Sequence, residues 1–219
     1  MSGQISEISV QKKRRDRFSV FIDNEYAFAL HRDVLLECGI AKGDCLDEQQ
    51  IKDILQLENL HKAKEQAMRL LAVRPRSRKE LGDRLQQKYS KEIAEQVLAR
   101  LQEIGLLNDA EFAIMYARSR LITHPQGSWL IKRELAQKGV AEDYIDTATN
   151  AAFAEKSEKE WAVDLAKKKM RTYRNIEEIK AKQRVRDFLI RRGFQWPLVI
   201  DILDHWDDIN ENDTGIETK

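Results

Sequence analysis

The stretch "RPRSRKELGDRLQQK", residues 74–88, combines a helix start with a narrow apolar stripe. Ser77 can cap the helix that follows it, and Glu80 stands three residues later, where it would complete a capping box. Leu81 and Leu85 lie one helical turn apart and give this helix a single apolar face. The other faces are polar, so the helix is expected to pack its one apolar stripe against neighbouring helices.

Two further amphipathic segments flank this helix. The segment before it supplies an apolar stripe around Ala67, Leu70 and Leu71. The segment after it, "SKEIAEQVLARLQEIG", is expected to end at Gly105. Its apolar residues recur with the period of a helix, at Ile93, Val97, Leu98, Leu101 and Ile104. Three short helices, each with one apolar face, predict a small three-helix bundle.

The same unit recurs twice further along the chain. Residues 77–98 can be aligned with residues 127–148 and with residues 181–203. The aligned positions are Leu81, Ile131 and Val185; Leu85, Leu135 and Leu189; Lys88, Lys138 and Arg192; Ile93, Tyr144 and Leu198; and Val97, Ala148 and Ile202. A period near 50 residues with apolar and basic positions in step is typical of a tandem helical array. The sequence therefore predicts three three-helix repeats.

The beginning of the chain has a different pattern. Apolar and polar residues alternate in "ISEISV" and on both sides of Asp23–Asn24, which predicts a β-hairpin. "HRDVLLECG" predicts a short helix that ends at Gly39. The predicted organisation is a small β-containing module over residues 1–55, helical repeats over 56–107, 108–155 and 156–206, and an acidic, disordered tail over 207–219.

Composition supports a mostly α fold. Charged residues make up 34% of the 219 residues, above the usual ~25%, and there are only nine Gly and three Pro. Cys38 and Cys45 are too few for a disulfide framework, and no Cys/His cluster has zinc spacing, so no metal is expected. The start of the chain has no apolar signal region and no apolar run approaches ~18 residues. We therefore expect a cytoplasmic protein without a membrane partner.

No pattern of catalytic residues is apparent. The four histidines, His31, His61, His124 and His205, are scattered, and none belongs to a metalloprotease or nucleophile motif. No phosphate-binding loop is present either. We therefore expect a protein that is not an enzyme and needs no cofactor.

Positive charge is distributed unevenly, although the formal net charge is only +1. Residues 167–192 carry eleven basic groups against three acids, and basic residues recur beside each middle helix. Free N–H groups at helix starts and adjacent Arg or Lys attract anions, so these edges could bind phosphates or an acidic groove. The candidate contacts are Arg74, Arg76, Arg118, Arg120, Lys132, Arg133, Lys168, Arg171, Arg184 and Arg192.

Each candidate also has a purely structural interpretation. Long basic side chains often do no more than keep a helix face solvated. Arg76 could serve its local turn, and the stem of Arg192 could cover apolar surface. Phe112, Tyr116 and Trp161 are expected in the core, whereas Trp129 could pack between helices or stack on a ligand, with packing favoured.

Three segments resemble the RecX family of bacterial recombination regulators. They are "AMRLLAVRPRSRKELGDRLQQK" (67–88), "GLLNDAEFAIMYARSRL" (105–121) and "GSWLIKRELAQKGV" (127–140), in the order typical of that family. The third repeat and the N-terminal module resemble longer members more loosely. This sequence departs from the pattern at Asn108, where an acid is usual, and after Lys88, where a Gly is missing.

The resemblance implies an extended, curved array of three repeats and a particular partner. That partner is the RecA recombinase filament on single-stranded DNA. Family members are understood to lodge in the filament groove, where they modulate, usually by inhibition, ATP hydrolysis, strand exchange and coprotease activity. A monomer that contacts several filament subunits, and DNA directly or through the filament, would fit these expectations.

Two other functions remain open on the sequence. Three short helices with a basic middle helix also suit a direct DNA-binding regulator of the helix–turn–helix kind. However, the middle helices place Leu and Glu where base-reading side chains would be needed. The other alternative is a helical scaffold for an unrelated acidic partner, which would show no dependence on RecA.

Overall fold

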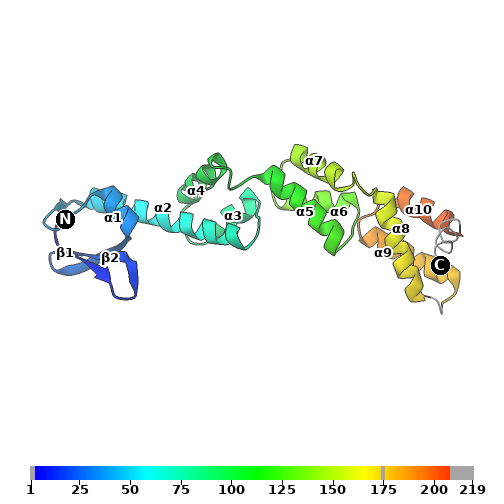
Figure 1. The fold of residues 1–219 in the computed structure, drawn as a ribbon, viewed down its shortest axis with the longest axis horizontal. Helices are drawn as coiled ribbons and strands as arrows, with labels where there is room; N and C mark the ends of the chain where they lie inside the picture. The colour runs from blue at the N-terminus through cyan, green and yellow to red at the C-terminus, as the bar shows by residue number, and fades with distance from the viewer. Residues whose placement is uncertain (1–2, 174–175, 208–219) are drawn as a thin grey trace, which may run out of the picture. The chain divides into compact units, whose positions relative to one another are not determined.

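The computed structural model describes residues 3–173 and 176–207, and these form a mostly α-helical protein (Figure 1). The described residues contain ten α-helices and a four-stranded sheet. The chain divides into two compact units. The first comprises Met1–Pro75 and Leu81–Leu106, and the second comprises Arg76–Glu80 and Leu107–Lys219. The tail predicted over 207–219 lies outside the described residues, apart from Asp207.

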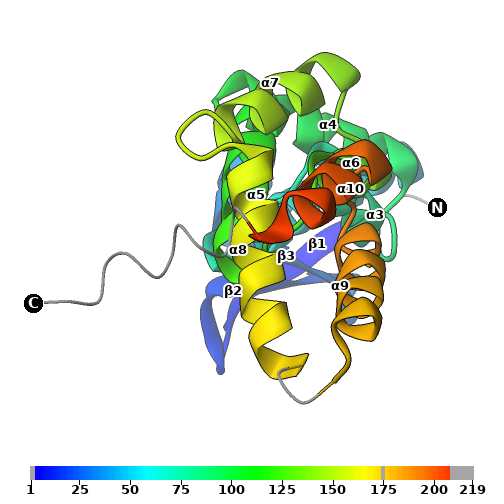
Figure 2. The same ribbon diagram turned by 90° about the vertical axis from the view of Figure 1, so that its right-hand side faces the viewer.

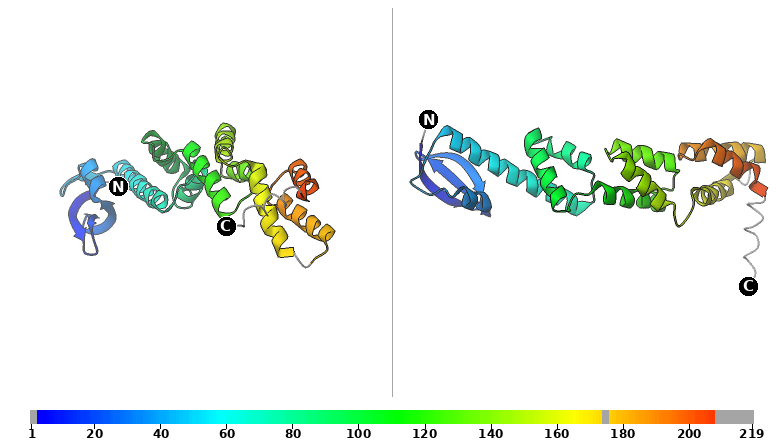
Figure 3. Two further views of the ribbon diagram at one scale, coloured as in Figure 1. Left: turned by 45° about the vertical axis from the view of Figure 1, so that its right-hand side comes forward. Right: turned by 90° about the horizontal axis from the view of Figure 1, so that it is seen from above.

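The N-terminal module is an antiparallel sheet. Its strands β1 (Gly3–Gln11), β2 (Arg14–Ile22), β3 (Glu25–His31) and β4 (Cys45–Leu46) lie in the order β3-β2-β1-β4. The predicted hairpin is confirmed, because Asp23 and Asn24 adopt positive φ values of 50° and 67° between β2 and β3. The strands curve strongly beside the first helices (Figure 3). The pairing of β1 with β4 had no signal in the sequence.

Helices α1 (Arg32–Cys38) and α2 (Glu48–Val73) close the module. Helix α1 ends at Gly39, as predicted, in the left-handed conformation. Helix α2 starts at a capping box made by Asp47 and Gln50 and continues for 26 residues. It contributes Ile54 to the module core. The boundary proposed after residue 55 therefore falls inside a continuous helix that the module and the first repeat share.

The first repeat adds α3 (Arg78–Leu85) and α4 (Lys91–Glu103) to α2. The amide of Glu80 donates to the hydroxyl of Ser77 at 3.1 Å, which confirms the predicted N-cap. The predicted apolar face of α4 is buried from Ile93 to Leu101, whereas Ile104 is 45% exposed. Ile104 lies outside the core because the helix ends at Glu103.

The second and third repeats repeat this pattern within the second unit. The second contains α5 (Asp109–Thr123), α6 (Ser128–Gln137) and α7 (Glu142–Ala152). The third contains α8 (Glu158–Met170), a 3₁₀ turn over Arg171–Tyr173, α9 (Glu178–Arg191) and α10 (Trp196–Asp204), seen together in Figure 2.

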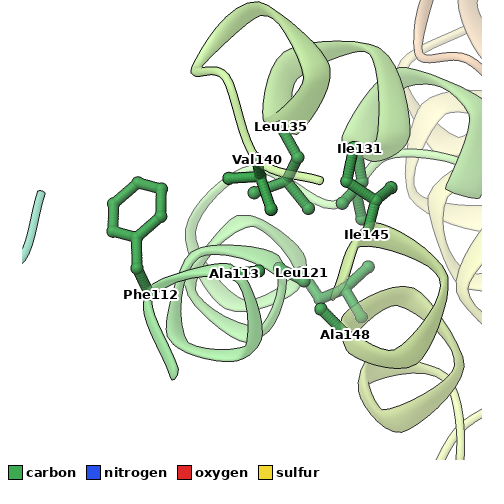
Figure 4. Close-up of a cluster of buried hydrophobic side chains, with 9 residues drawn as sticks. Phe112, Ala113, Leu121, Ile131, Leu135, Val140, Ile145 and Ala148 are labelled. Carbon is green, nitrogen blue, oxygen red and sulfur yellow. The ribbon is translucent and has the colours of Figure 1, made fainter. Parts of the chain in front are cut away.

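The cores of the repeats are built from the aligned apolar positions. Leu81, Ile131 and Val185 are completely buried. So are the residues one turn later, Leu85, Leu135 and Leu189. In the second repeat, Ile131 and Leu135 of α6 meet Val140, Ile145 and Ala148 above α5, with Phe112 at the start of that helix (Figure 4). The three-repeat prediction is thereby confirmed.

One aligned position is wrong by a residue in two of the three repeats, since Val199 is completely buried and the aligned Leu198 is only half-buried. Tyr144, which was aligned with Ile93 and Leu198 as an apolar core position, is 46% exposed. Its neighbour Ile145 is only 6% exposed. The third helix of this repeat begins after Ala141, so its buried stripe starts with the fourth helical residue.

Candidate partner-binding surface

A hydrogen-bonded joint recurs between the segment that starts one middle helix and the end of the next middle helix. In the second unit, the hydroxyl of Ser77 donates to the carbonyl of Lys138 at 2.6 Å. At the aligned position of the next repeat, the amide of Gly127 donates to the carbonyl of Arg192 at 2.8 Å. A Cβ on Gly127 would lie 2.2 Å from the Gly193 carbonyl oxygen, so only glycine fits there.

Each joint is completed by an acid from the first helix of the following repeat. Asp109 accepts the amide of Arg78 at 2.7 Å, and Glu158 accepts the amide of Ser128 at 2.9 Å. These carboxylates satisfy N–H groups at the start of α3 and α6, which a helix cannot satisfy itself. They also occupy two helix N-termini that the sequence suggested as anion sites.

Arg120 is held inside a polar network of the second repeat. Its Nε donates to Glu134 Oε2 at 2.8 Å, and the same oxygen accepts from Tyr116 Oη at 2.9 Å and from Gln126 Nε2 at 3.0 Å. Burial, together with the Glu134 carboxylate, raises the pKa of Tyr116. Arg120 therefore serves the packing of α5 on α6, and its availability to a partner is limited.

Arg118 lies on the opposite side of the same helix. Two residues correspond to a rotation of about 200° around a helix, so Arg118 faces away from the Arg120 network. Its side chain is exposed. Of the two candidates on α5, Arg118 is the one whose charge is presented to solvent.

The middle helix of the second repeat presents an aromatic and two basic residues. Trp129 is 52% exposed, so the expectation that it packs between helices is wrong. The guanidinium of Arg133 lies 5.4 Å from the centre of its ring. Lys132 is also exposed and pairs with Asp146 at 2.6 Å, a surface ion pair that water and salt weaken. Trp129 and Arg133 form a solvent-facing cation–π pair.

The third repeat carries the densest grouping of cations and aromatic rings. Arg184 lies 5.5 Å from the Tyr173 ring, and Arg192 lies 5.4 Å from the Phe188 ring. The ammonium of Lys169 lies 5.2 Å from Tyr173 and 5.5 Å from Phe188. We call these five residues the basic–aromatic strip. Cations held over ring faces keep their charge at the surface while their stems are fixed.

The remaining candidates lie at helix ends. Arg74 is exposed and donates to the carbonyl of Pro75 at 2.8 Å, and Arg76 is half-buried in the turn before α3. Lys168 is exposed near the end of α8, and Arg171 is exposed in the 3₁₀ turn that follows.

The structure brings two of the candidate residues together and adds three residues from outside the candidate set. Arg184 and Arg192 come together in the basic–aromatic strip, which also includes Lys169, Tyr173 and Phe188. The spacing of Arg184, Phe188 and Arg192, four residues apart on one helix, was a usable signal. The approach of Lys169 from a different helix could not be seen without the fold.

Two of the four histidines, which are scattered along the sequence, meet in the structure. The rings of His31 and His61 stack with centres 4.1 Å apart. Their approach depends on the packing of β3 against α2, and no local motif indicates it.

These features define a class of protein: a β-containing module followed by three helical repeats, with basic side chains on solvent-facing helix surfaces. Within the described residues, no helix is both long and apolar enough to cross a membrane.

The chain belongs to the RecX family. The regulatory protein RecX N-terminal domain matches residues 3–47, and the first, second and third three-helix domains of RecX match residues 63–101, 108–148 and 157–203. All three repeats and the N-terminal module are therefore family features.

Relatives and solved structures agree with this assignment. The chain is 33% identical to the regulatory protein RecX of Bacillus subtilis over 97% of its own length and 81% of the relative. It is 33% identical to that of Bacillus cytotoxicus over 87% of its length and 72% of the relative. A crystal structure of regulatory protein RecX matches 92% of this chain and 99% of that chain, with 32% identity and a TM-score of 0.72. RecX from Lactobacillus salivarius shares the fold, with 24% identity and a TM-score of 0.61, over 69% of this chain and 98% of its own.

Proposed function

We propose that this protein binds the RecA filament on single-stranded DNA, in its groove, and inhibits ATP hydrolysis, strand exchange and coprotease activity. It acts in the cytoplasm as a monomer, without an enzymatic activity of its own, in recombination, repair and the SOS response. The observation that carries the proposal is the family match over all four domains of the chain. The relatives are named regulatory proteins, which agrees with a role that is not enzymatic.

Basic residues supply the chemistry for such a partner, some of them exposed and two, Lys169 and Arg192, half-buried. Arg118 and Arg133 in the second repeat, and the basic–aromatic strip in the third, present cations that suit phosphates or carboxylates. Each contact is weak because it is exposed to water and salt. Repeats that engage successive filament subunits would add their contributions as avidity.

The first test is RecA ATP hydrolysis on single-stranded DNA, with this protein titrated in at substoichiometric amounts. We expect hydrolysis to slow. The double variant Arg118→Glu/Arg133→Glu should weaken this effect by roughly tenfold or more, since each lost or reversed contact contributes about 1 kcal/mol. Arg120 is left intact because it supports the fold.

A charge-matched control is the double variant Lys52→Glu/Lys64→Glu, at two exposed positions of α2 outside the candidate set. It should inhibit as the unmodified protein does. If the folded protein leaves hydrolysis unchanged at every ratio, with RecA from the same source, the proposal is wrong. If Lys52→Glu/Lys64→Glu weakens inhibition as much as Arg118→Glu/Arg133→Glu does, the assigned surface is wrong.

Direct DNA binding is the second candidate, favoured by the solvent-facing Trp129 and Arg133 on a middle helix. Phosphate binding alone predicts affinity that falls steeply with salt and ignores sequence. A base-reading regulator should lose about 1–3 kcal/mol for each wrong base pair. Binding isotherms on several duplexes and single strands, measured without RecA, distinguish phosphate binding from base reading.

A further inference from the structure

Three potential metal ligands meet where the N-terminal module packs on α2. His31 ends β3 and caps α1, and its ring stacks on that of His61 at an interplanar angle of 23°. Glu65 follows His61 by one helical turn. One ligand atom from each of His31, His61 and Glu65 lies within 4.8 Å of the other two. All three residues belong to the first compact unit.

One ring nitrogen in this cluster has an unused binding capacity. His61 Nε2 is buried and has no hydrogen-bond partner among the described residues. Its nearest acid is Glu65, whose Oε1 lies 3.9 Å away, beyond hydrogen-bonding distance. Buried polar atoms normally have partners, so an unpaired imidazole nitrogen beside a carboxylate points to a missing ligand.

Further carboxylates lie beside the two imidazoles. Asp16 Oδ2 lies 3.6 Å from His31 Nε2, and Asp33 Oδ2 lies 3.5 Å from His31 Nδ1. The nearby carboxylate of Glu58 is different, because it is already neutralised by Arg17 and Lys62. Arg32 and Arg69 approach Asp33 and Glu65 at 3.9 Å and 4.0 Å, in exposed ion pairs that water and salt weaken, so carboxylate oxygens remain available beside the two imidazoles.

We propose that His31, His61 and Glu65 form a site for a divalent transition-metal ion of the Zn²⁺ kind, with Asp16 as a further oxygen ligand. Two imidazoles and one or two carboxylates are a donor set that suits Zn²⁺. The site is separate from the basic surfaces assigned to the filament. It would link the end of β3 to α2 and so fasten the module to the first repeat.

Ligation requires two small adjustments. The lone pairs of nearly parallel rings do not converge on one point, so one ring must rotate, and His61 loses no Nε2 hydrogen bond when it does. His31 Nδ1 now accepts the amide of Asp33 at 3.2 Å. In the ligating tautomer, Nδ1 instead carries a proton and donates to the Asp33 carboxylate, the usual support for a metal-bound histidine.

The test is titration of the full chain with Zn²⁺ by calorimetry and with Co²⁺ by absorption spectroscopy. We expect one ion per chain, a Co²⁺ spectrum of nitrogen and oxygen ligands, and a higher unfolding temperature with Zn²⁺. His61→Gln and Glu65→Gln should each weaken binding by at least about tenfold, and Asp33→Asn, a positioning change, by about tenfold. Circular dichroism checks that each variant is folded.

Matched controls are His205→Gln and the double variant Cys38→Ser/Cys45→Ser, which should leave the affinity unchanged. Three results would overturn the proposal: no binding at ~100 μM Zn²⁺, a thiolate spectrum with Co²⁺, or affinity that survives both His61→Gln and Glu65→Gln. RecA inhibition is read separately, so failure of this site does not bear on the proposed function.

Discussion

At the scale of single residues, Glu58 is a buried acid whose carboxylate needs several hydrogen-bond partners. Its carboxylate is 1% exposed and accepts from the amide of His31 at 2.8 Å, from Arg17 at 2.8 Å and from Lys62 at 3.1 Å. Burial by itself would raise the pKa of Glu58, but the His31 amide and the two cations outweigh it and hold the pKa below the ordinary value of 4.5. The ionised carboxylate of Glu58 therefore joins β2, β3 and α2.

Replacing Glu58 by Gln should lower the free energy of unfolding by about 3 kcal/mol at pH 7, because Arg17 loses its buried counter-charge. A depressed pKa in the folded state gives stability that is present above the unfolded-state value and is lost as the pH falls through the folded-state value. The difference between the two proteins should therefore shrink below pH ~4.5. Urea unfolding of both proteins at several pH values measures the difference in their free energies of unfolding. A difference that does not change with pH would contradict the role assigned to the ionised carboxylate of Glu58.

Variants of Arg118 and Arg120, which lie on the same helix, can distinguish a residue that contacts the partner from a residue that stabilises the fold. Arg120→Gln breaks the ion pair with Glu134 and should lower the free energy of unfolding by roughly 1–2 kcal/mol. Arg118→Gln should change it by less than about 0.5 kcal/mol, since the side chain is exposed. Chemical denaturation checks both values. An Arg118→Gln variant as unstable as Arg120→Gln would place Arg118 in the fold rather than on the surface.

At the scale of elements, the contact of α6 with the end of α9 depends on two glycines. Gly127→Ala should lower the free energy of unfolding by about 1–3 kcal/mol, because its Cβ would meet the Gly193 backbone, which cannot move aside. Gly127 has φ −71°, so the cost is purely steric. Gly82→Ala is the control, since its Cβ meets only the end of Leu98 at 3.2 Å. Equal losses in both variants would disprove this explanation.

The repeats themselves were predictable because helix chemistry is local. Ser77 and Ser90 act as N-caps where the sequence placed helix starts, and Gly139 has the positive φ expected after a helix. Asn108, the departure from the family pattern, caps α5 through bonds to the amides of Ala110 and Glu111. Asn and Asp are equally good caps, so this substitution leaves the fold unchanged.

The candidate surface was less predictable because charge alone does not reveal what a side chain contacts. Arg118 and Arg120 look equivalent in the sequence, yet one is exposed and the other is held by Glu134. Trp129 sits among apolar neighbours in the sequence, but its own position on α6 faces solvent. The meeting of His31 with His61 joins residues thirty positions apart across a β–α contact, which no periodicity encodes.

At the scale of the whole molecule, the distribution of charge governs association with an acidic partner. Residues 208–219 contain four acids and one Lys, so removing them shifts the formal net charge of +1 by three units. We expect this truncation to raise affinity for single-stranded DNA, and more so at low salt, if the acidic segment competes for the basic surfaces. Fluorescence anisotropy at two salt concentrations measures the affinity of the truncated and the full-length chain. If the two chains bind equally at both salt concentrations, the acidic segment does not compete for the basic surfaces.

The joint between middle helices also gives the repeat series a direction. The donor always comes from the start of one middle helix, at Ser77 and Gly127, and the acceptor from the end of the next. The aligned donor in the third repeat is Ala181, but α9 begins three residues earlier and the Ala181 amide already bonds to Glu177. A duplicated copy of the second repeat could regenerate the joint on both sides. A repeat packed against the start of α9 would therefore not find the donor that Ser77 and Gly127 supply in the first two repeats.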